Sequence, residues 1–219
     1  MNDLVILGAG GVGRQVAQIT RDINSVAATW NLVGYLDDDL SRMGERVAGI
    51  TVLGDPDWLC LHCNVHVAIA IGDSPARFKA YRRLKAIRHR RIATLVHPSA
   101  WRGMRVVIGT GTIVYANAVL DPDVTIGNGS IINKVCTVGH DASVGDFVTL
   151  GPGVNLGGGV HVGSGSCFGI NSATIHGLHI GDWSVVGAGA VVVDDLPANV
   201  IAVGVPARVV RTRDAGWYS

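Results

Sequence analysis

The chain has 219 residues, of which 18 are Lys or Arg and 17 are Asp or Glu, so its formal net charge at pH 7 is only +1. This balance argues against nucleic acids or other polyanions as partners. The length suits one large or two modest domains, and no run approaches the ~20 apolar residues of a membrane span. Because residues 1–7 lack a secretory leader and the four cysteines lack paired spacing, we expect a cytoplasmic protein.

The first elements predicted from the sequence are a strand, a turn, a helix and a second strand. Leu4–Leu7 is an apolar run typical of a buried parallel strand, and it leads into a glycine turn, Gly8–Gly13. Arg14–Ile23 is then expected to form a helix. A second apolar strand, Leu32–Leu36, ends in three acids, Asp37–Asp39. This order indicates a small Rossmann-like α/β domain, in which the turn lets a phosphate approach the N-terminus of the helix.

The glycine turn has the spacing G-x-G-x-x-G, which on its own would suggest NAD. However, only about 95 residues precede the repeats of the C-terminal half, too few for the full six-strand dinucleotide fold. We therefore favour a nucleoside diphosphate attached to a sugar as the ligand. NAD and a purely structural turn are the alternatives.

Residues 60–66 combine cysteine and histidine in a way that suggests a metal site. Cys60, His62, Cys63 and His66 can supply half of a zinc site. The sequence offers no second half, so we interpret the segment as the end of one helix and the start of a strand, Val65–Ile71.

A basic helix is expected after that strand. Gly72 closes the strand, Ser74 and Pro75 suit the start of a helix, and the helical pattern reaches about His89. The segment Arg77–Arg91 carries eight Lys or Arg residues. We expect these to form a solvated face, with a phosphate or membrane-surface contact as the alternative. The apolar residues at helical spacing are expected to pack inward: Phe78, Tyr81, Leu84 and Ile87.

The C-terminal half contains an uninterrupted ladder of fifteen residues spaced six apart. Only Thr174 is not a large apolar residue, and Gly follows ten of the fifteen rungs. About 45–50% of ordinary residues are apolar. The probability that fifteen such positions contain only one exception by chance is therefore on the order of 10⁻³, even with six possible frames. The rungs are Ile108, Val114, Leu120, Ile126, Ile132, Val138, Val144, Leu150, Leu156, Val162, Phe168, Thr174, Ile180, Val186 and Val192.

A six-residue period predicts a chain that coils with three flat faces, one short strand and one turn per face. Coils that stack at about 4.8 Å place each rung over its counterpart one coil away, as for Ile108 and Ile126. The Gly after a rung suits a corner where a Cβ would clash or need an unfavourable φ. Small residues two positions before the rungs suit a narrow interior: Thr112, Ala118, Ser130, Cys136, Ala142, Ser166, Ser172, Ser184 and Ala190. We therefore predict a parallel β-helix of roughly five coils.

Six segments in a fixed order carry a resemblance to one family. They are GAGGVGRQ, GYLDDD, IGDSPAR, the junction HPSA at residues 97–100, VGHDASVGDF and VGVPAR. Together they resemble the bacterial sugar acyltransferase family, which includes NeuD-type sialic acid O-acetyltransferases and N-acetyltransferases of nucleotide-linked 4-amino sugars. The resemblance implies a Rossmann-like nucleotide-sugar-binding domain at residues 1–96 and a left-handed β-helix acyltransferase domain with a C-terminal tail at residues 97–219. It also implies acetyl-CoA as cosubstrate, no metal, and a homotrimer.

The resemblance assigns roles to single residues. His140 is implied to be the general base, and Asp141 the acid that orients it. Four residues fall where the family contacts acyl-CoA: Asn133, Gly158, Ile170 and Ala188. Five others resemble the contacts to the nucleotide-sugar: Gly10, Gly11, Asp37, Asp38 and Gly72. Val12 stands where the family's glycine turn commonly has His, which leaves the type of nucleotide open. Arg208 and Arg211 are candidates for contact with the nucleotide phosphates of CoA.

The chemistry of acyl transfer explains why these residue types are needed. An amine or hydroxyl that attacks a thioester carbonyl loses a proton, and neutral imidazole, with a pKa near 6.5, can accept it. No nucleophilic Ser or Cys is required, so Cys136 and Cys167 are interpreted as small coil residues. We predict an acetyl-CoA-dependent acetyltransferase acting on the amino group of a nucleotide-linked amino sugar. O-acetylation of sialic acid or another surface-polysaccharide sugar is the alternative.

Two remote alternatives belong to other classes of protein. A zinc hydratase of the gamma carbonic anhydrase type uses three histidines, but His140 and His176 are two coils, about 10 Å, apart. His161 and His179 each precede a rung and are expected at the surface. A non-catalytic nucleotide-sugar-binding subunit would leave the intact repeat and the pair of His140 and Asp141 without a purpose.

Overall fold

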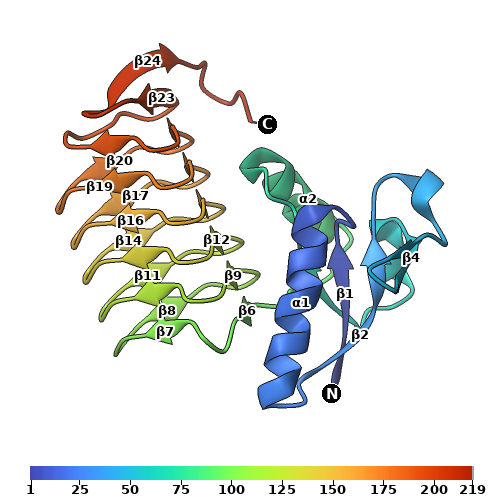
Figure 1. Ribbon diagram of the computed structural model, residues 1–219. Coiled ribbons are helices and arrows are strands. Elements are labelled where there is room, and N and C mark those ends of the chain that lie inside the picture. Colours follow the sequence, from blue (N-terminus) through green and yellow to red (C-terminus); the bar gives the residue numbers. More distant parts are fainter. Residues whose placement is uncertain (219) are drawn as a thin grey trace. The chain divides into compact units, whose positions relative to one another are not determined.

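The computed structural model describes residues 1–218, and the chain forms two compact units, Met1–Pro98 and the residues from Ser99 onward. Figure 1 shows both units and labels many of their helices and strands. Within the described residues, no helix is both long and apolar enough to cross a bilayer.

The N-terminal unit contains a five-stranded sheet with the order β3-β4-β2-β1-β5. Its elements are β1 (Asn2–Leu7), α1 (Gly11–Val26), β2 (Trp30–Leu36), η1 (Leu40–Arg42), β3 (Arg46–Val47), β4 (Ile50–Gly54), η2 (Pro56–Cys60), β5 (His66–Ile69), α2 (Ser74–Ala86) and β6 (Leu95–Val96). Neighbouring strands are parallel except β3 and β4, which form a hairpin. From β1 the chain first adds β2 and β4 on one side. It then adds β5 on the other side of β1, so the direction in which strands are added reverses between β1 and β5. The predicted Rossmann-like fold is confirmed.

The central strand β1 is buried on both of its faces. Leu7 pairs with Leu36 and packs in one core cluster with Leu84 of α2. Ile6 pairs with Tyr35 on the opposite face, where a Cβ on Gly13 of α1 would lie 3.4 Å from the Tyr35 ring. A helix therefore covers each face, which explains why the strands are apolar runs rather than alternating patterns.

Several predicted boundaries differ from the structure, and β1 and β2 each begin two residues before the predicted start. α1 is longer than predicted at both ends, and β5 is shorter than the predicted strand, since it covers only four residues. α2 ends at Ala86 instead of continuing to His89 or Arg91. It ends because Arg88 adopts a φ of 58°, the left-handed conformation that commonly stops a helix and that usually requires Gly. The sequence has no glycine there to signal the end.

The hairpin of β3 and β4 was not predicted. Its turn consists of Ala48 and Gly49, which have φ values of 50° and 83°. Two positive φ values are typical of a two-residue hairpin turn, but Asn or Asp usually takes the first position. Because Ala48 takes that position, the sequence lacks the Asn-Gly or Asp-Gly pair that would predict the turn.

The C-terminal unit is a parallel β-helix whose short strands stack in three faces (Figure 1). The first face contains β7 (Trp101–Arg102), β10 (Val119–Leu120), β13 (Thr137–Val138), β16 (Asn155–Leu156), β19 (Ala173–Thr174) and β22 (Val191–Val192). The second contains β8 (Val107–Ile108), β11 (Thr125–Ile126), β14 (Ser143–Val144), β17 (His161–Val162) and β20 (His179–Ile180). The third contains β9 (Ile113–Val114), β12 (Ile131–Ile132), β15 (Thr149–Leu150), β18 (Cys167–Phe168), β21 (Val185–Val186) and β23 (Val200–Val203), and antiparallel to β23 runs β24 (Arg208–Thr212).

The register confirms the predicted 18-residue coil. Ile108 pairs with Ile126, which pairs with Val144, and the column continues through Val162 to Ile180. Every rung is buried except Ile108 in the first coil, which is half-buried. The nine small residues two positions before the rungs are all buried too, at 1% exposure or less. The interior is therefore as narrow as the sequence predicts.

The glycines after the rungs are required by close packing between coils. A Cβ on Gly139 would lie 2.5 Å from the backbone nitrogen of Gly158 in the next coil. The positive φ values fall instead three residues after the rungs, as at Asp141 with a φ of 60°. Of the two reasons predicted for these glycines, the structure supports the clash of a Cβ and not the unfavourable φ.

Candidate functional site

His140 lies at one corner of the β-helix, between β13 and β14. The residues at the same place in the following coils, 18 residues apart, are Gly158, His176 and Asp194. We call this column, from His140 to Asp194, the histidine corner. His140, His176 and Asp194 are all exposed, so the side chains of this corner project into solvent.

The His140 side chain is 70% exposed and is oriented by Asp141. Its Nδ1 lies 2.8 Å from Asp141 Oδ2. Because a carboxylate only accepts hydrogen bonds, this contact places the imidazole proton on Nδ1 and leaves the lone pair on Nε2. The hydrogen bond and charge of Asp141 raise the pKa of His140, with a smaller contribution from Asp121. The side chain is thus a base whose free nitrogen faces solvent.

Gly158 lies directly beside the free nitrogen of His140. A Cβ on Gly158 would be 2.6 Å from His140 Nε2 and 2.8 Å from Cε1. Any other residue at this position would therefore press against the imidazole. The structure brings His140, Asp141 and Gly158 together, and these are three of the residues to which the sequence analysis assigned roles.

Arg208 is also held at the histidine corner. Its Nη1 donates to Asp194 Oδ2 at 3.3 Å, and both side chains are exposed. Asp194 is three coils from His140, so the base and the guanidinium are separated by about 14 Å along the coil axis. Arg211 is exposed on the same strand, β24.

The other predicted acyl-CoA contacts lie at a different corner. Asn133, Ile170 and Ala188 follow the strands of the third face, and Ile170 is 56% exposed. We call this the apolar corner. Val135, also in it, is exposed and has a φ of 58°, which is rare for a β-branched residue. One β-helix therefore holds the predicted acyl-CoA contacts at two separate corners.

The two coil cysteines are not placed for nucleophilic attack. Cys136 is buried, and burial raises the pKa of its thiol to about 11. Cys167 lies half-buried in β18. A thiol that stays protonated at neutral pH is a poor nucleophile, so the interpretation of Cys136 as a small interior residue agrees with the structure.

In the N-terminal unit, the glycine turn leaves the start of α1 open. Gly10 is the residue before the helix; no side chain caps the helix there, and its first turn contains no acid. A Cβ on Gly10 would meet nothing within 4 Å. Gly8 is different, because its φ is 105° and a Cβ would lie 2.9 Å from the carbonyl oxygen of Ala70. The turn thus packs tightly against the strand ends at Gly8 and exposes free backbone N–H groups at α1, an arrangement that suits an anion.

The predicted substrate residues Asp37 and Asp38 are both paired with arginines. Asp37 Oδ2 accepts the backbone N–H of Ala9 at 2.8 Å and lies 3.1 Å from Arg42 Nη1. Asp38 Oδ1 lies 2.7 Å from Arg83 Nη1. Asp37 therefore holds the glycine turn in place.

Arg77 corrects the expectation that the basic helix forms only a solvated face. It is fully buried, and its Nη1 donates to the carbonyl oxygens of Ile71 and Gly72 at 2.8 and 2.9 Å. It thereby fixes the segment after β5 that contains Gly72. A Cβ added to Gly72 would lie 3.3 Å from the Val12 side chain, so this segment lies against the glycine turn. Arg77 cannot be singled out from sequence, because it lies within a run of eight basic residues that are mostly exposed.

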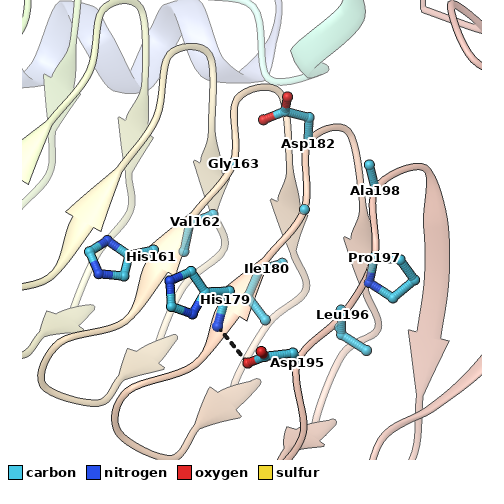
Figure 2. A pocket seen from close by; sticks show the side chains of 11 residues that line it. His161, Val162, Gly163, His179, Ile180, Asp182, Asp195, Leu196, Pro197 and Ala198 are labelled. Carbon is cyan, nitrogen blue, oxygen red and sulfur yellow. Dashed lines mark hydrogen bonds between the residues drawn. The ribbon is translucent and has the colours of Figure 1, made fainter.

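An open hollow of about 760 Å³ lies on the second face of the β-helix and does not include His140. Figure 2 shows His161 and His179 side by side in this hollow, with ring centroids 4.7 Å apart. Ser143 Oγ lies 2.6 Å from His161 Nδ1, and Asp195 accepts the backbone N–H of His179. Both imidazoles are at the surface, as predicted.

The cysteine and histidine cluster at residues 60–66 is spread out. Cys60 and Cys63 are exposed, and His62 stacks on Trp58 at a centroid distance of 3.5 Å. His66 packs edge-on against Trp30. Nowhere in residues 1–218 do three or more His, Cys, Asp or Glu side chains gather in a way that could hold a metal ion. The segment before β5 is the short helix η2.

Comparison with known proteins shows similarity along nearly the whole chain. Residues 3–84 match the PglD N-terminal domain family. A mutant of perosamine N-acetyltransferase from Caulobacter crescentus, solved with CoA and GDP-perosamine, is 33% identical with a TM-score of 0.87, and the match covers 95% of this chain and 97% of that one. The acetyltransferase domain of PglB from Neisseria gonorrhoeae, solved with acetyl coenzyme A, is 29% identical with a TM-score of 0.84, over 96% and 100% of the two chains.

The similarity to curated proteins covers shorter stretches of the chain. Galactoside O-acetyltransferase from Escherichia coli is 53% identical over 45 residues, which is 19% of this chain and 22% of that protein. The match thus spans only about a fifth of that relative. The full-length structural matches confirm both the predicted combination of a Rossmann-like unit with a left-handed β-helix and the predicted dependence on acetyl-CoA. The chain therefore belongs to the hexapeptide-repeat acetyltransferase family, in the branch whose members carry a PglD-type N-terminal domain.

Proposed function

We propose that this chain transfers the acetyl group of acetyl-CoA to the amino group of a nucleotide-linked amino sugar, with His140 as the general base. The observation that carries the proposal is the free Nε2 of His140, which is oriented by Asp141 and lies beside the gap left by Gly158. The relatives that match along the full length include a perosamine N-acetyltransferase, which agrees with transfer to an amine.

In the proposed reaction the sugar amine attacks the thioester carbonyl carbon, and a C–N bond forms. His140 Nε2 accepts the proton that the amine loses, and Asp141 stabilises the imidazolium. The C–S bond then breaks, and the proton passes from His140 to the leaving thiolate of CoA. A base of this kind typically contributes about 10² to 10⁴-fold to the rate.

The histidine corner supports a route for acetyl-CoA along the coil axis. Gly158 leaves space next to the base, and Arg208 offers a cation for the CoA phosphates about 14 Å away. That separation suits the long, flexible pantetheine arm.

The apolar corner supports a homotrimer. Asn133, Ile170 and Ala188 would contact the same acyl-CoA if the apolar corner of one copy faced the histidine corner of the next. Such a contact joins two different surfaces, so repeating it closes a ring only if each copy is rotated by a whole fraction of a turn from the last, and we propose a third of a turn. We propose that acetyl-CoA binds between two copies.

The N-terminal unit supports binding of the nucleotide. The open N-terminus of α1, with Gly10 and Gly11, lies at the carboxyl edge of the sheet beside β1 and β5, where the strand order reverses and where ligands of such sheets usually bind. We assign the nucleotide-sugar to residues 1–96 and acyl transfer to residues 97–219. Asp37 and Gly72 line this edge, and Asp37 also fixes the turn through Ala9. The free cysteines suit the reducing cytoplasm, where we place the reaction.

The test is release of free thiol from acetyl-CoA in the presence of a panel of nucleotide-linked sugars, amino and non-amino. We expect a response to an amino sugar that is lost in His140→Ala. A response to non-amino sugars alone would favour O-acetylation. Equal activity of His140→Ala and the unchanged protein would refute the assignment of the base.

A further inference from the structure

We propose that the N-terminal unit selects guanine, through a pocket in which Asp38 recognises the base. This inference rests on the proposed binding of a nucleotide-linked sugar. The base pocket has a volume of about 260 Å³ and is lined by Asp38, Ile71, Ala76, Lys79, Ala80 and Arg83. Drug-sized ligands occupy sites of about 300 to 1,000 Å³, so this pocket suits a base alone.

The base pocket adjoins the proposed phosphate site. Asp38 directly follows Asp37, whose carboxylate accepts the backbone N–H of Ala9 in the glycine turn. Ile71 directly precedes Gly72, which faces Val12 of the same turn. A nucleoside whose phosphates bind at the start of α1 therefore has this pocket beside it.

The base pocket is lined by both apolar and charged side chains. Ala76 and Ala80 are one turn apart on α2 and so lie on the same side of the helix. Lys79 and Arg83 are also one turn apart and bring two positive charges to the rim. A planar aromatic ring with polar edges fits this combination, because its face can pack on the small side chains while its edge reaches the charges.

Asp38 is held in position, and its second carboxylate oxygen can accept hydrogen bonds from a ligand. Arg83 pairs with Asp38, Asp55 and Asp57 and so ties the carboxylate through Oδ1. Asp38 Oδ2 has no hydrogen-bond partner in the described part of the chain, and the side chain is 69% exposed. Each carboxylate oxygen accepts two hydrogen bonds, so both oxygens can still receive a ligand.

Only guanine among the common bases matches a carboxylate. Guanine presents two adjacent donors, N1–H and N2–H, followed by the acceptor O6. The carboxylate of Asp38 can accept both donors, and Lys79 can donate to O6. Uracil and thymine present a single N–H between two carbonyl oxygens, which a carboxylate repels. Adenine and cytosine place a ring nitrogen lone pair next to their amino group, which it also repels.

The test is calorimetric binding of nucleoside diphosphates to the intact protein and to Asp38→Asn. We expect GDP to bind the unchanged protein at least tenfold more tightly than UDP, dTDP, CDP or ADP. Asp38→Asn should weaken the binding of GDP by roughly ten- to hundredfold, because charge-assisted hydrogen bonds between the carboxylate and guanine are lost. The same change should improve binding of xanthosine diphosphate, whose base carries a carbonyl oxygen in place of the guanine amino group and can accept from the new amide.

Asp57→Asn is the matched control. Asp57 also pairs with Arg83, at 2.9 Å, but does not line the base pocket, so its removal should leave the order of the nucleotides unchanged. Preference of the unchanged protein for UDP, dTDP, CDP or ADP would overturn the guanine inference and leave the proposed function standing. Loss of GDP binding in Asp57→Asn as large as in Asp38→Asn would also overturn it. Failure to bind any diphosphate would refute the nucleotide part of the proposed function itself.

Discussion

The β-helix and the N-terminal unit position their functional side chains by different means. In the β-helix, the backbone repeats from coil to coil, so the place of a residue in the six-residue period fixes where its side chain points. His140 and Gly158 occupy the same corner of successive coils and differ only in the side chain. In the N-terminal unit, the loops at the sheet edge are fixed by arginines, and Arg77 and Arg83 are examples.

This contrast shows where each unit tolerates change. A corner residue of the β-helix has little influence on the fold, because the rungs and the pairing of strands hold the coil. A buried arginine of the N-terminal unit holds the loop that carries the site, so its loss affects fold and function together.

The largest expected effect is the loss of catalysis in His140→Ala. We expect kcat/KM to fall by about 10² to 10⁴-fold, because the general base is removed. The melting temperature should stay unchanged, since the side chain is 70% exposed. His161→Ala, which removes another surface histidine of the coil, is the control and should retain activity. A comparable loss in His161→Ala would contradict the assignment.

Arg77→Ala should give the opposite result, a loss of stability in the N-terminal unit. The change leaves the carbonyl oxygens of Ile71 and Gly72 without this donor and creates a cavity where the buried side chain was, which should cost about 3 kcal/mol. Hydrogen exchange followed by mass spectrometry should show faster exchange in β5 and α2. Arg82→Ala, an exposed arginine of the same helix, should change stability by less than about 0.5 kcal/mol. Equal effects of the two variants would show that burial of Arg77 is unimportant.

Gly158→Ala should reduce kcat/KM by roughly 10 to 100-fold, because a Cβ displaces the His140 ring from its position. The three nearest atoms that this Cβ would meet all belong to His140. Gly158→Ala should therefore add no further loss of activity in a protein that already carries His140→Ala. Additive losses in the double variant would mean that Gly158 acts independently of the base.

The smallest expected effect is a shift of the pH profile in Asp141→Asn. Asp141 raises the pKa of His140, and the base works only when it is deprotonated, so kcat/KM should rise with pH through a pKa above the usual 6.5. Asp141→Asn removes the negative charge, so the rising limb should move to lower pH. A limb that stays in place would show that another group controls the profile.

The two units also differ in how far the sequence predicts them. The rungs, the 18-residue register and the small interior residues of the β-helix follow from the repeat, because each contact joins equivalent positions. The coil positions of His140 and Gly158, one above the other, follow from the same arithmetic. Their contact depends on side-chain direction, which the period does not provide.

In the N-terminal unit, the pattern predicted β1, β2, β5 and the glycine turn, but neither the hairpin of β3 and β4 nor the contacts that hold the loops. Arg83 lies 45 and 28 residues from its partners Asp38 and Asp55, whereas Arg77 lies only six and five residues from the carbonyl groups of Ile71 and Gly72 that it binds. A run of basic residues has the same composition whether one member is buried or all are solvated. The end of α2 was missed for a related reason, since Arg88 takes a conformation that the sequence would assign to Gly.

The most direct test of the central claim is identification of the product by NMR after incubation with acetyl-CoA and a nucleotide-linked amino sugar. The proposed function predicts an acetamide on the sugar amine, formed together with one equivalent of CoA by the unchanged protein and not by His140→Ala. An acetyl ester on a sugar hydroxyl, or the same amide formed at the same rate by His140→Ala, would contradict it.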